Sequence, residues 1–337
     1  MKNQNLAYLM AFCFVSAPLT VMAGAYVSSS GAAPDRITHP SGYTGSGGVL
    51  DVTVCINPSS ESIAEMIVSV ENVVNTFNEL QPTTGNVLLG GSNDIPSGAI
   101  DFESTVLHEV GHCIGLAHPN LASESGLAGA DRNYTKSDEG PNNTFDLGIG
   151  NDGLRGSGDD LRGDDINLHW FRMSNNNPFS IDAVVDVSTY SRDLDDLPGG
   201  DTYAANADRD VSGLFGIPTT EAVMQQGAFS DEDQRALGHD DVATLRLGMA
   251  GLDETQGTGD DYTLNLIYGG VASGCDVTIT VTGASFAFCS VPTTTISGNH
   301  RRVTTANAQF GSAANFNWFF NPNPNQQELI FADGFEI

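Results

Sequence analysis

The residues best able to do chemistry together lie in one short segment, residues 108–118, which reads HEVGHCIGLAH. In a helix, a spacing of four residues places His108 and His112 on one face, where both imidazoles can reach a single cation. Gly115 permits a tight exit from such a helix, so that His118 can turn back as a third ligand. Imidazole nitrogens with a carboxylate nearby are typical of a zinc site.

Three protein ligands leave one coordination position for water, whose pKa zinc lowers to roughly 7. Glu109 follows the first ligand and would take the proton of that water as general base and pass it to the leaving amine. The pattern therefore predicts a zinc-dependent endopeptidase with Glu109 as the catalytic residue and His108, His112 and His118 as ligands. The alternative is a non-catalytic exported protein that keeps zinc for structure, but zinc binding alone does not require Glu109. The other histidines lack ligand spacing and are predicted to be structural or exposed: His39, His169, His239 and His300.

The segment HEVGHCIGLAH is similar to the elongated zinc signature of the metzincin metallopeptidases, and Pro119 after the third histidine resembles the serralysin group. Residues 220–226, TEAVMQQ, resemble the Met-turn of the matrixins, which implies that Met224 lies beneath the metal. The resemblance implies an α/β (α+β) catalytic domain built around the active-site helix. It also implies that residues 87–90 form the edge strand along which an extended peptide substrate pairs.

A stretch rich in Gly and Asp follows at residues 146–165. Its segment GSGDDLRG resembles one calcium-binding repeat of the Gly-Asp type found in serralysins. Carboxylates and carbonyls are the hard oxygen ligands that calcium prefers. The candidate ligands are Asp152, Asp159, Asp160, Asp164 and Asp165. The alternative is an acidic loop that is only solvated.

The amino terminus has the features of an export signal in residues 1–25: Lys2, an apolar run at residues 6–21, and small residues from Ala23 to Ala25. Cleavage after Ala23 and cleavage after Ala25 both fit. An uncleaved anchor is the alternative, although the run is short for a membrane span, and no later segment is apolar enough to cross a bilayer. The predicted location is secreted or extracellular, with the periplasm or cell surface as alternatives, and the terminal LIFADGFE resembles tails of other exported bacterial proteins.

Five cysteines are present, and Cys13 falls within the predicted signal. The four that remain, Cys55, Cys113, Cys275 and Cys289, fit two disulfide bonds in an oxidising compartment. Four cysteines allow three connectivities. Proximity along the chain favours Cys55 with Cys113 and Cys275 with Cys289.

The charge of the chain limits its partners. The 337 residues contain 13 Lys and Arg against 42 Asp and Glu, a formal net charge of −29. Such a surface repels polyanions, so nucleic acid is excluded as a partner, and a protein or peptide substrate is expected instead.

Apolar periodicity predicts the elements that position these residues. Residues 49–56 alternate like a strand, and apolar residues at three to four residue spacing predict a helix over residues 59–77. A second helix is predicted at residues 101–115, carrying the histidines, and a third at residues 240–247.

The same patterns divide the chain into regions after the signal. Residues 26–251 are predicted to form the catalytic domain. Residues 252–320 alternate in the β manner and are predicted to form a small all-β appendage. Residues 321–337 are read as a linker and short tail because of their Asn-Pro repeats.

Overall fold

The computed structural model describes most of the chain: residues 24–29, 33, 35–119, 147–148, 151, 153, 161–162, 170–174, 177–192, 196, 207, 209–214, 216–225 and 227–324. The helices of this part are α1 (Ile63–Glu79), the short 3₁₀ helix η1 (Gly90–Ser92), α2 (Phe102–Cys113), α3 (Arg209–Leu214) and α4 (His239–Met249). The strands before α3 are β1 (Ala25–Tyr26), β2 (Ile37–His39), β3 (Gly48–Ile56), β4 (Leu88–Leu89), β5 (Ile100–Asp101), β6 (Leu116–Ala117), β7 (Leu147–Gly148), β8 (Leu161–Arg162), β9 (Phe171–Arg172) and β10 (Tyr190–Ser191). Those after it are β11 (Glu232–Asp233), β12 (Tyr262–Val271), β13 (Val277–Gly283), β14 (Ala287–Ser290), β15 (Thr293–Ser297), β16 (His300–Val303), β17 (Ala306–Gly311) and β18 (Trp318–Phe319). The fold is a mixed α/β fold with few helices and many strands in several sheets.

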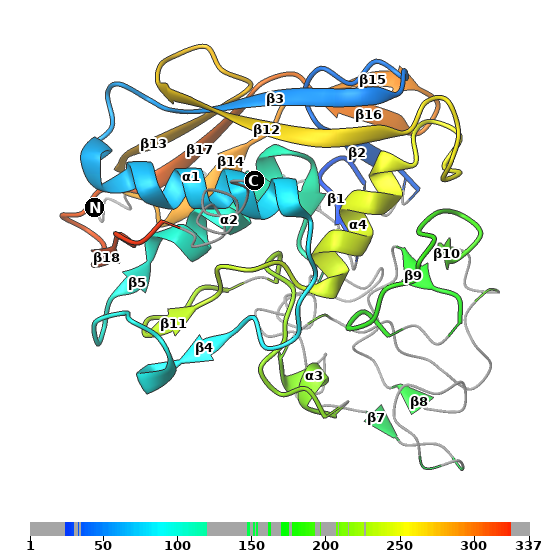
Figure 1. Cartoon of the computed structure of the whole chain (residues 1–337), viewed down its shortest axis with the longest axis horizontal. Coiled ribbons are helices and arrows are strands. Elements are labelled where there is room, and N and C mark those ends of the chain that lie inside the picture. Colours follow the sequence, from blue (N-terminus) through cyan, green and yellow to red (C-terminus); the bar gives the residue numbers. More distant parts are fainter. Residues whose placement is uncertain are drawn as a thin grey trace, which may run out of the picture.

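One five-stranded sheet, in the order β12-β3-β13-β17-β14, forms the layer at the top of Figure 1. The strands run parallel, except that β14 is antiparallel to β17. The predicted strand at residues 49–56 is confirmed as β3, which lies between β12 and β13. Both edges of β3 are therefore paired, which satisfies its backbone N–H and C=O groups.

The prediction of a separate all-β appendage at residues 252–320 is wrong. Four of the five strands in the sheet, β12, β13, β14 and β17, come from this region, and they complete the sheet that β3 begins. The alternating pattern correctly indicated strands there, but it carries no information on which strand each of them pairs with. The region is thus part of the same core as the histidine helix, and its β15 and β16 form a second, three-stranded sheet with β2.

The helices α1 and α2 cover one face of this sheet (Figure 1). The predicted helix at residues 59–77 is confirmed as α1, although it begins at Ile63, after Ser62, rather than at residue 59. Met66, Val70 and Phe77 are at most 1% exposed, and they form the stripe that packs against the strands. None of the helices in the described part of the chain is long and apolar enough to cross a membrane.

The predicted second helix is confirmed as α2, with ends that chemistry explains. Asp101 is its N-cap: the Asp101 carboxylate accepts the N–H of Ser104 at 2.9 Å. The guanidinium of Arg235 donates to the same carboxylate at 2.8 and 2.9 Å, so the start of α2 is fixed by a buried bidentate ion pair. Gly115, just past the end of the helix, has φ +116°, and a Cβ there would lie 2.6 Å from the carbonyl oxygen of Thr38. The tight exit expected at this glycine is confirmed.

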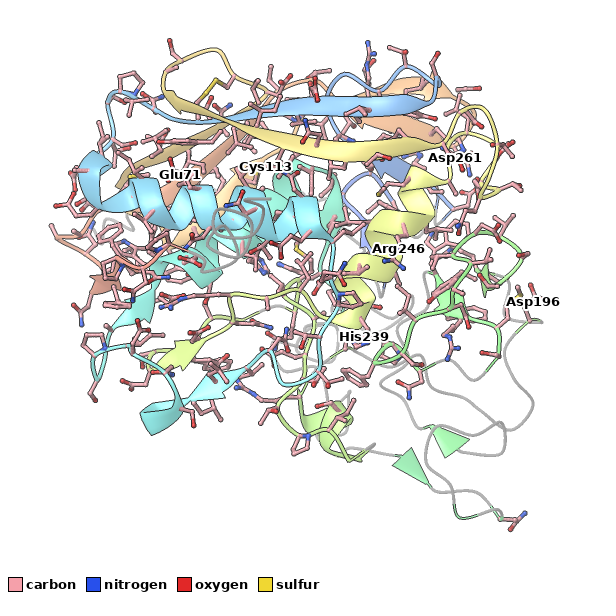
Figure 2. The ribbon with its side chains drawn as sticks, viewed as in Figure 1. Glu71, Cys113, Asp196, His239, Arg246 and Asp261 are labelled. Carbon is pink, nitrogen blue, oxygen red and sulfur yellow. A yellow bond between two sulfur atoms is a disulfide. The ribbon has the colours of Figure 1, made fainter. Side chains whose placement is uncertain are left out.

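The predicted third helix is confirmed as α4, which begins at His239 and ends at Met249. In Figure 2, His239 marks the end of α4 that is farther from the sheet. From there the helix runs past Arg246 toward the sheet. Its contacts are with β12, β2 and β6. Because β6 leads directly to His118, α4 packs against the segment that positions this histidine.

All four cysteines predicted to form disulfides do so, but both predicted pairs are wrong. The bonds are Cys55–Cys275, with Cα atoms 6.0 Å apart, and Cys113–Cys289, with Cα atoms 5.7 Å apart. The reason is the sheet topology: Cys55 lies in β3 beside the start of β13, and Cys113 ends α2, which packs on β14. The bonds join positions 220 and 176 residues apart, and loops of this length imply a stabilisation on the order of 2–5 kcal/mol for each bond.

Candidate metal centre

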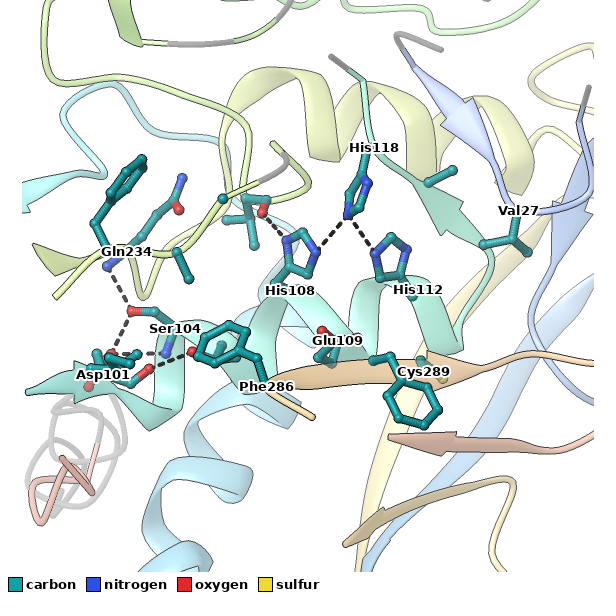
Figure 3. Close-up of a pocket in the computed structure, with 18 of the residues that line it drawn as sticks. Val27, Asp101, Ser104, His108, Glu109, His112, His118, Gln234, Phe286 and Cys289 are labelled. Atoms are coloured by element: carbon teal, nitrogen blue, oxygen red, sulfur yellow. Dashed lines mark hydrogen bonds between the residues drawn. The ribbon is translucent and has the colours of Figure 1, made fainter. Parts of the chain in front are cut away.

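Three imidazoles meet at one point where α2 faces the segment after β6. Nε2 of His118 lies 3.0 Å from Nε2 of His108 and 3.0 Å from Nε2 of His112 (Figure 3). The first two rings project from α2 one turn apart, and the third comes from the chain that turns back after Gly115. The structure therefore brings together the three residues that the sequence selected, and the group could bind a metal ion.

Backbone carbonyls orient two of the rings, because each carbonyl is hydrogen-bonded to the Nδ1 atom, which leaves Nε2 directed toward the centre. Nδ1 of His108 lies 2.7 Å from the carbonyl oxygen of Val223, and Nδ1 of His112 lies 2.9 Å from that of Leu116. A carbonyl can only accept, so both Nδ1 atoms carry the hydrogen and both Nε2 atoms present lone pairs. His118 can offer at most one hydrogen to these two acceptors. Since burial also lowers the pKa of all three rings, to about 3 for His112, the cluster is neutral and suited to a cation at its centre.

Met224 packs directly against the helix that carries two of these histidines. A Cβ at Gly111, between the two ligands of α2, would collide with Sδ of Met224. The turn that contains Met224 is held by α4, because the carboxylate of Asp241 accepts the N–H groups of Val223 at 2.8 Å and Met224 at 3.1 Å. The same turn supplies the Val223 carbonyl to His108, so Asp241 positions a ligand through one intervening residue.

Glu109 lies beside the three rings, on the same helix (Figure 3). The residue is 5% exposed, and its Oε2 has no hydrogen-bond partner among the described residues. Burial raises the pKa of this carboxyl group to about 8, and the backbone N–H of Cys289 opposes the shift. A divalent cation held by the neighbouring imidazoles would lower this pKa by favouring the carboxylate form.

The rings and Glu109 open onto a pocket of about 640 Å³. Side chains that line it come from α2, from β1, from the chain after Met224 and from β14, and they include Tyr26, Val27, Ile100, Thr105, Phe229, Glu232, Phe286, Phe288, Cys289 and Val291. The lining is mainly apolar apart from the histidines and a few carboxylates. Such a pocket with few converging polar groups is the usual form of a small-molecule or peptide site.

Sequence reasoning missed the wall formed by β14. The expected strand at residues 87–90 is found as β4, which pairs with β11 in a separate two-stranded sheet, and the pairing of a substrate along it stays a prediction. The strand at the edge of the main sheet beside the pocket is β14. The alternation of Phe286 and Phe288 indicated a strand, but the separation of Phe286 from His118, 168 residues along the chain, did not indicate a shared site. The Cys113–Cys289 bond is the one signal that would have linked them.

The remaining predicted residues divide into three groups. His239 is the first residue of α4, away from the three converging imidazoles. His39 and His300 are 0% and 3% exposed and hydrogen-bonded to each other at 2.9 Å, in agreement with a structural role. The calcium candidates and one histidine lie outside the described residues, so those expectations stay predictions: Asp152, Asp159, Asp160, Asp164, Asp165 and His169.

Comparisons of the chain with protein-family models, with curated proteins and with solved structures find no match. The resemblance of the histidine segment to metzincins therefore stays a prediction of the sequence. The function has to be argued from the geometry of the site.

Proposed function

We propose that this chain is an exported zinc-dependent endopeptidase. One observation carries the proposal: three imidazole nitrogens converge at the base of a pocket, and the buried carboxylate of Glu109 stands beside them with one oxygen free of partners among the described residues. A metal site kept only for structure is usually closed by four protein ligands. Three ligands beside an open pocket and an unused carboxylate favour catalysis.

The donor set fits zinc. Three neutral imidazoles are the ligand set of several catalytic zinc sites, and two of them are oriented by backbone carbonyls, as outer-shell partners of ligating histidines commonly are. Zinc at this centre would supply a Lewis acid that lowers the pKa of a water molecule and polarises a carbonyl group.

Glu109 would carry the proton. Its side chain is enclosed next to the centre, where it would accept a proton from the attacking water and deliver it to the amine nitrogen that leaves. The proton that Glu109 takes from the water is the one that it would deliver in the second of these transfers. The carbonyls of Val223 and Leu116 would meanwhile hold two of the imidazoles in place.

The walls of the pocket suit an extended polypeptide. β14 pairs with β17 along one edge and is the last strand of the sheet. Its Cys289 N–H donates to Glu109, and the other backbone groups of its outer edge could form hydrogen bonds with a peptide. Phe286, Phe288 and Phe229 offer apolar contacts to substrate side chains. The substrate class supported best is therefore an unstructured segment of a protein.

The test is hydrolysis of unfolded casein by the purified mature protein, with zinc content measured in parallel. Glu109→Gln should keep one zinc per chain and lose hydrolysis by about 100-fold or more, because general acid–base catalysis contributes that much. Glu103→Gln is the matched control: Glu103 lies on the same helix, is 1% exposed, and accepts hydrogen bonds from Asn72 and Asn321 rather than lining the pocket. It should keep both zinc and activity.

Other outcomes would separate the alternatives. Hydrolysis that survives both a zinc chelator and Glu109→Gln would contradict the proposal. One zinc per chain without hydrolysis of any protein substrate would favour the non-catalytic binding protein.

A further inference from the structure

The strand β14 forms one wall of the pocket and is the outermost strand of the main sheet. It is four residues long and pairs with β17 alone. The chain leaves this sheet directly afterwards, because β15 belongs to the three-stranded sheet with β16 and β2. Before β14, the ring of Phe286 stacks on that of Trp318, with ring centroids 5.4 Å apart. Sheet pairing therefore holds this wall from one edge only.

The Cys113–Cys289 bond attaches β14 to the helix that carries two of the histidines and Glu109. Cys113 is the last residue of α2, directly after His112, and is 1% exposed. Cys289 is the third residue of β14 and lines the pocket (Figure 3). The Cα atoms of the two cysteines are 5.7 Å apart. The bond thus fixes the distance between the wall of the pocket and the last turn of α2.

The same residue of β14 also contacts Glu109. The backbone N–H of Cys289 donates to the carboxyl group of Glu109, and Oε2 of that group has no hydrogen-bond partner among the described residues. Glu109 and Cys113 are four residues apart in α2, so their side chains lie on one face of the helix. Cys289 is therefore attached to this face twice, by its sulfur to Cys113 and by its N–H to Glu109.

We propose that the Cys113–Cys289 bond is a positioning element of the active site: it holds the N–H of Cys289 on one oxygen of Glu109, so that the other oxygen stays free for the attacking water. The catalytic consequence rests on the proposed function, in which Glu109 is the general base. A carboxyl group that is already fixed before the reaction needs no reorientation during it. Without the bond, β14 can move away from α2 and take the N–H with it.

The second disulfide provides a matched comparison. Cys55–Cys275 joins β3 to the chain just before β13, and neither of these cysteines is among the residues that line the pocket. The two bonds span 220 and 176 residues, so loop closure predicts nearly the same stabilisation from each. A difference in catalysis between proteins that lack one bond or the other therefore reports the position of the bond and not its contribution to stability.

The first test follows the amide hydrogen of Cys289 and needs neither zinc nor hydrolysis. Without the predicted signal the chain has four cysteines, so isotopic labelling of cysteine nitrogen gives four amide signals in NMR spectra. The Cys289 amide should exchange with solvent at least about tenfold more slowly in the parent protein than in Glu109→Ala, which removes its acceptor. Glu109→Gln should keep the slow exchange, because its side-chain oxygen can still accept. The amides of Cys55 and Cys275 should exchange at the same rate in all three proteins.

The second test compares two double variants: Cys113→Ala with Cys289→Ala, and Cys55→Ala with Cys275→Ala. Both should lower the thermal midpoint, by roughly 5 °C or more, and both should keep one zinc per chain. Only the first should lower kcat on casein, by roughly tenfold or more, because a small misplacement of a catalytic group is costly. A wall that only binds substrate would raise KM without lowering kcat, so the two constants separate positioning from binding.

The bond can also be opened without a substitution at either of its ends, which provides a test if the first double variant does not fold. In the protein with Cys55→Ala and Cys275→Ala, a water-soluble phosphine should reduce Cys113–Cys289 to two thiols, while the phosphine takes an oxygen atom from water and becomes its oxide. Reduction should speed the exchange of the Cys289 amide and lower kcat at constant zinc content. Reoxidation of the two thiols should restore both.

Two results would overturn this inference. One is a Cys289 amide that exchanges equally fast in the parent protein and in Glu109→Ala. The other is an equal loss of kcat in the two double variants. A Cys289 amide whose slow exchange depends on Glu109 and on the bond, in a protein that hydrolyses no substrate, would support the positioning of Glu109 and defeat the proposed function alone.

Discussion

Two groups of buried histidines in this chain satisfy their ring nitrogens in opposite ways. At the metal centre, His108 and His112 use one nitrogen each on a backbone carbonyl, and the other nitrogens converge on His118. In the second group, Nε2 of His39 bonds Nδ1 of His300 at 2.9 Å, and Nε2 of His300 lies 3.3 Å from a carboxylate oxygen of Glu254. In the second group each ring nitrogen is hydrogen-bonded to the next residue in a row, whereas in the first group the Nε2 atoms, which can act as acceptors, face one another.

The difference distinguishes histidines that could bind a metal ion from histidines with a structural role. Burial alone does not, because both groups are shielded from solvent. In the second group Tyr262 lies 3.4 Å from the remaining nitrogen of His39, so each ring nitrogen has a neighbour that can donate or accept. Only the first group has more lone pairs than hydrogens to donate, and a cation at the centre would accept those lone pairs.

The largest expected effect is on zinc binding. His118→Ala removes one of three ligands and should weaken zinc affinity on the order of 100-fold or more, beyond the loss typical for outer-shell partners. His300→Ala, the matched loss of a buried imidazole, should retain one zinc per chain. Metal content after dialysis against a weak chelator measures both. Loss of zinc from the His300 variant would contradict the assignment of zinc binding to the first group and of a structural role to the second.

An intermediate effect is expected on acid stability. Burial lowers the pKa of His39 from 6.5 to about 3, so below pH 6.5 the unfolded chain binds a proton that the folded chain does not. The stability linked to this group is therefore complete above pH 6.5 and falls as the pH decreases toward about 3, by up to roughly 1.4 kcal/mol per pH unit. In the metal-free protein, His39→Gln should flatten the pH dependence of the unfolding free energy by that slope. Urea unfolding at a series of pH values measures it, and parallel curves for the two proteins would contradict the assignment.

The smallest expected effect is at Met224, whose thioether packs against α2 behind the three histidines. Met224→Leu conserves volume and should cost less than about 1.5 kcal/mol of stability and change zinc affinity by less than about tenfold. Met249→Leu, the same change at the end of α4, should leave zinc affinity unchanged. A loss of zinc in the Met224 variant as large as in the His118 variant would mean that the sulfur itself belongs to the centre.

What the sequence could predict were the features that depend on local spacing. The interval between His108 and His112, the glycine that follows their helix, and the apolar periodicity of α1, α2 and α4 all depend on neighbours a few residues apart. Each of these elements lies within a few residues of its predicted position. The convergence of His118 on the other two rings follows from the same short segment.

What could not be predicted are contacts across long separations. The alternation in β12, β13 and β14 marks them as strands, but pairing to β3 depends on the shape of the whole core rather than on any nearby residue. The two disulfide pairs were wrong for the same reason, since sequence proximity was used in place of the unknown topology. The wall at Phe286 and Phe288 was missed because it belongs to a region that looked like a separate unit.

The position of β3 between β12 and β13 also sets an order of events during biogenesis. A chain that leaves the ribosome or crosses a membrane amino terminus first presents β3 early, but the Cys55–Cys275 bond beside it spans 220 residues. Such non-local pairing makes folding slow and leaves both edges of β3 open to wrong partners until the last third of the chain is delivered. Because β14 emerges later still, the pocket beside the three histidines lacks one wall until most of the chain has been delivered.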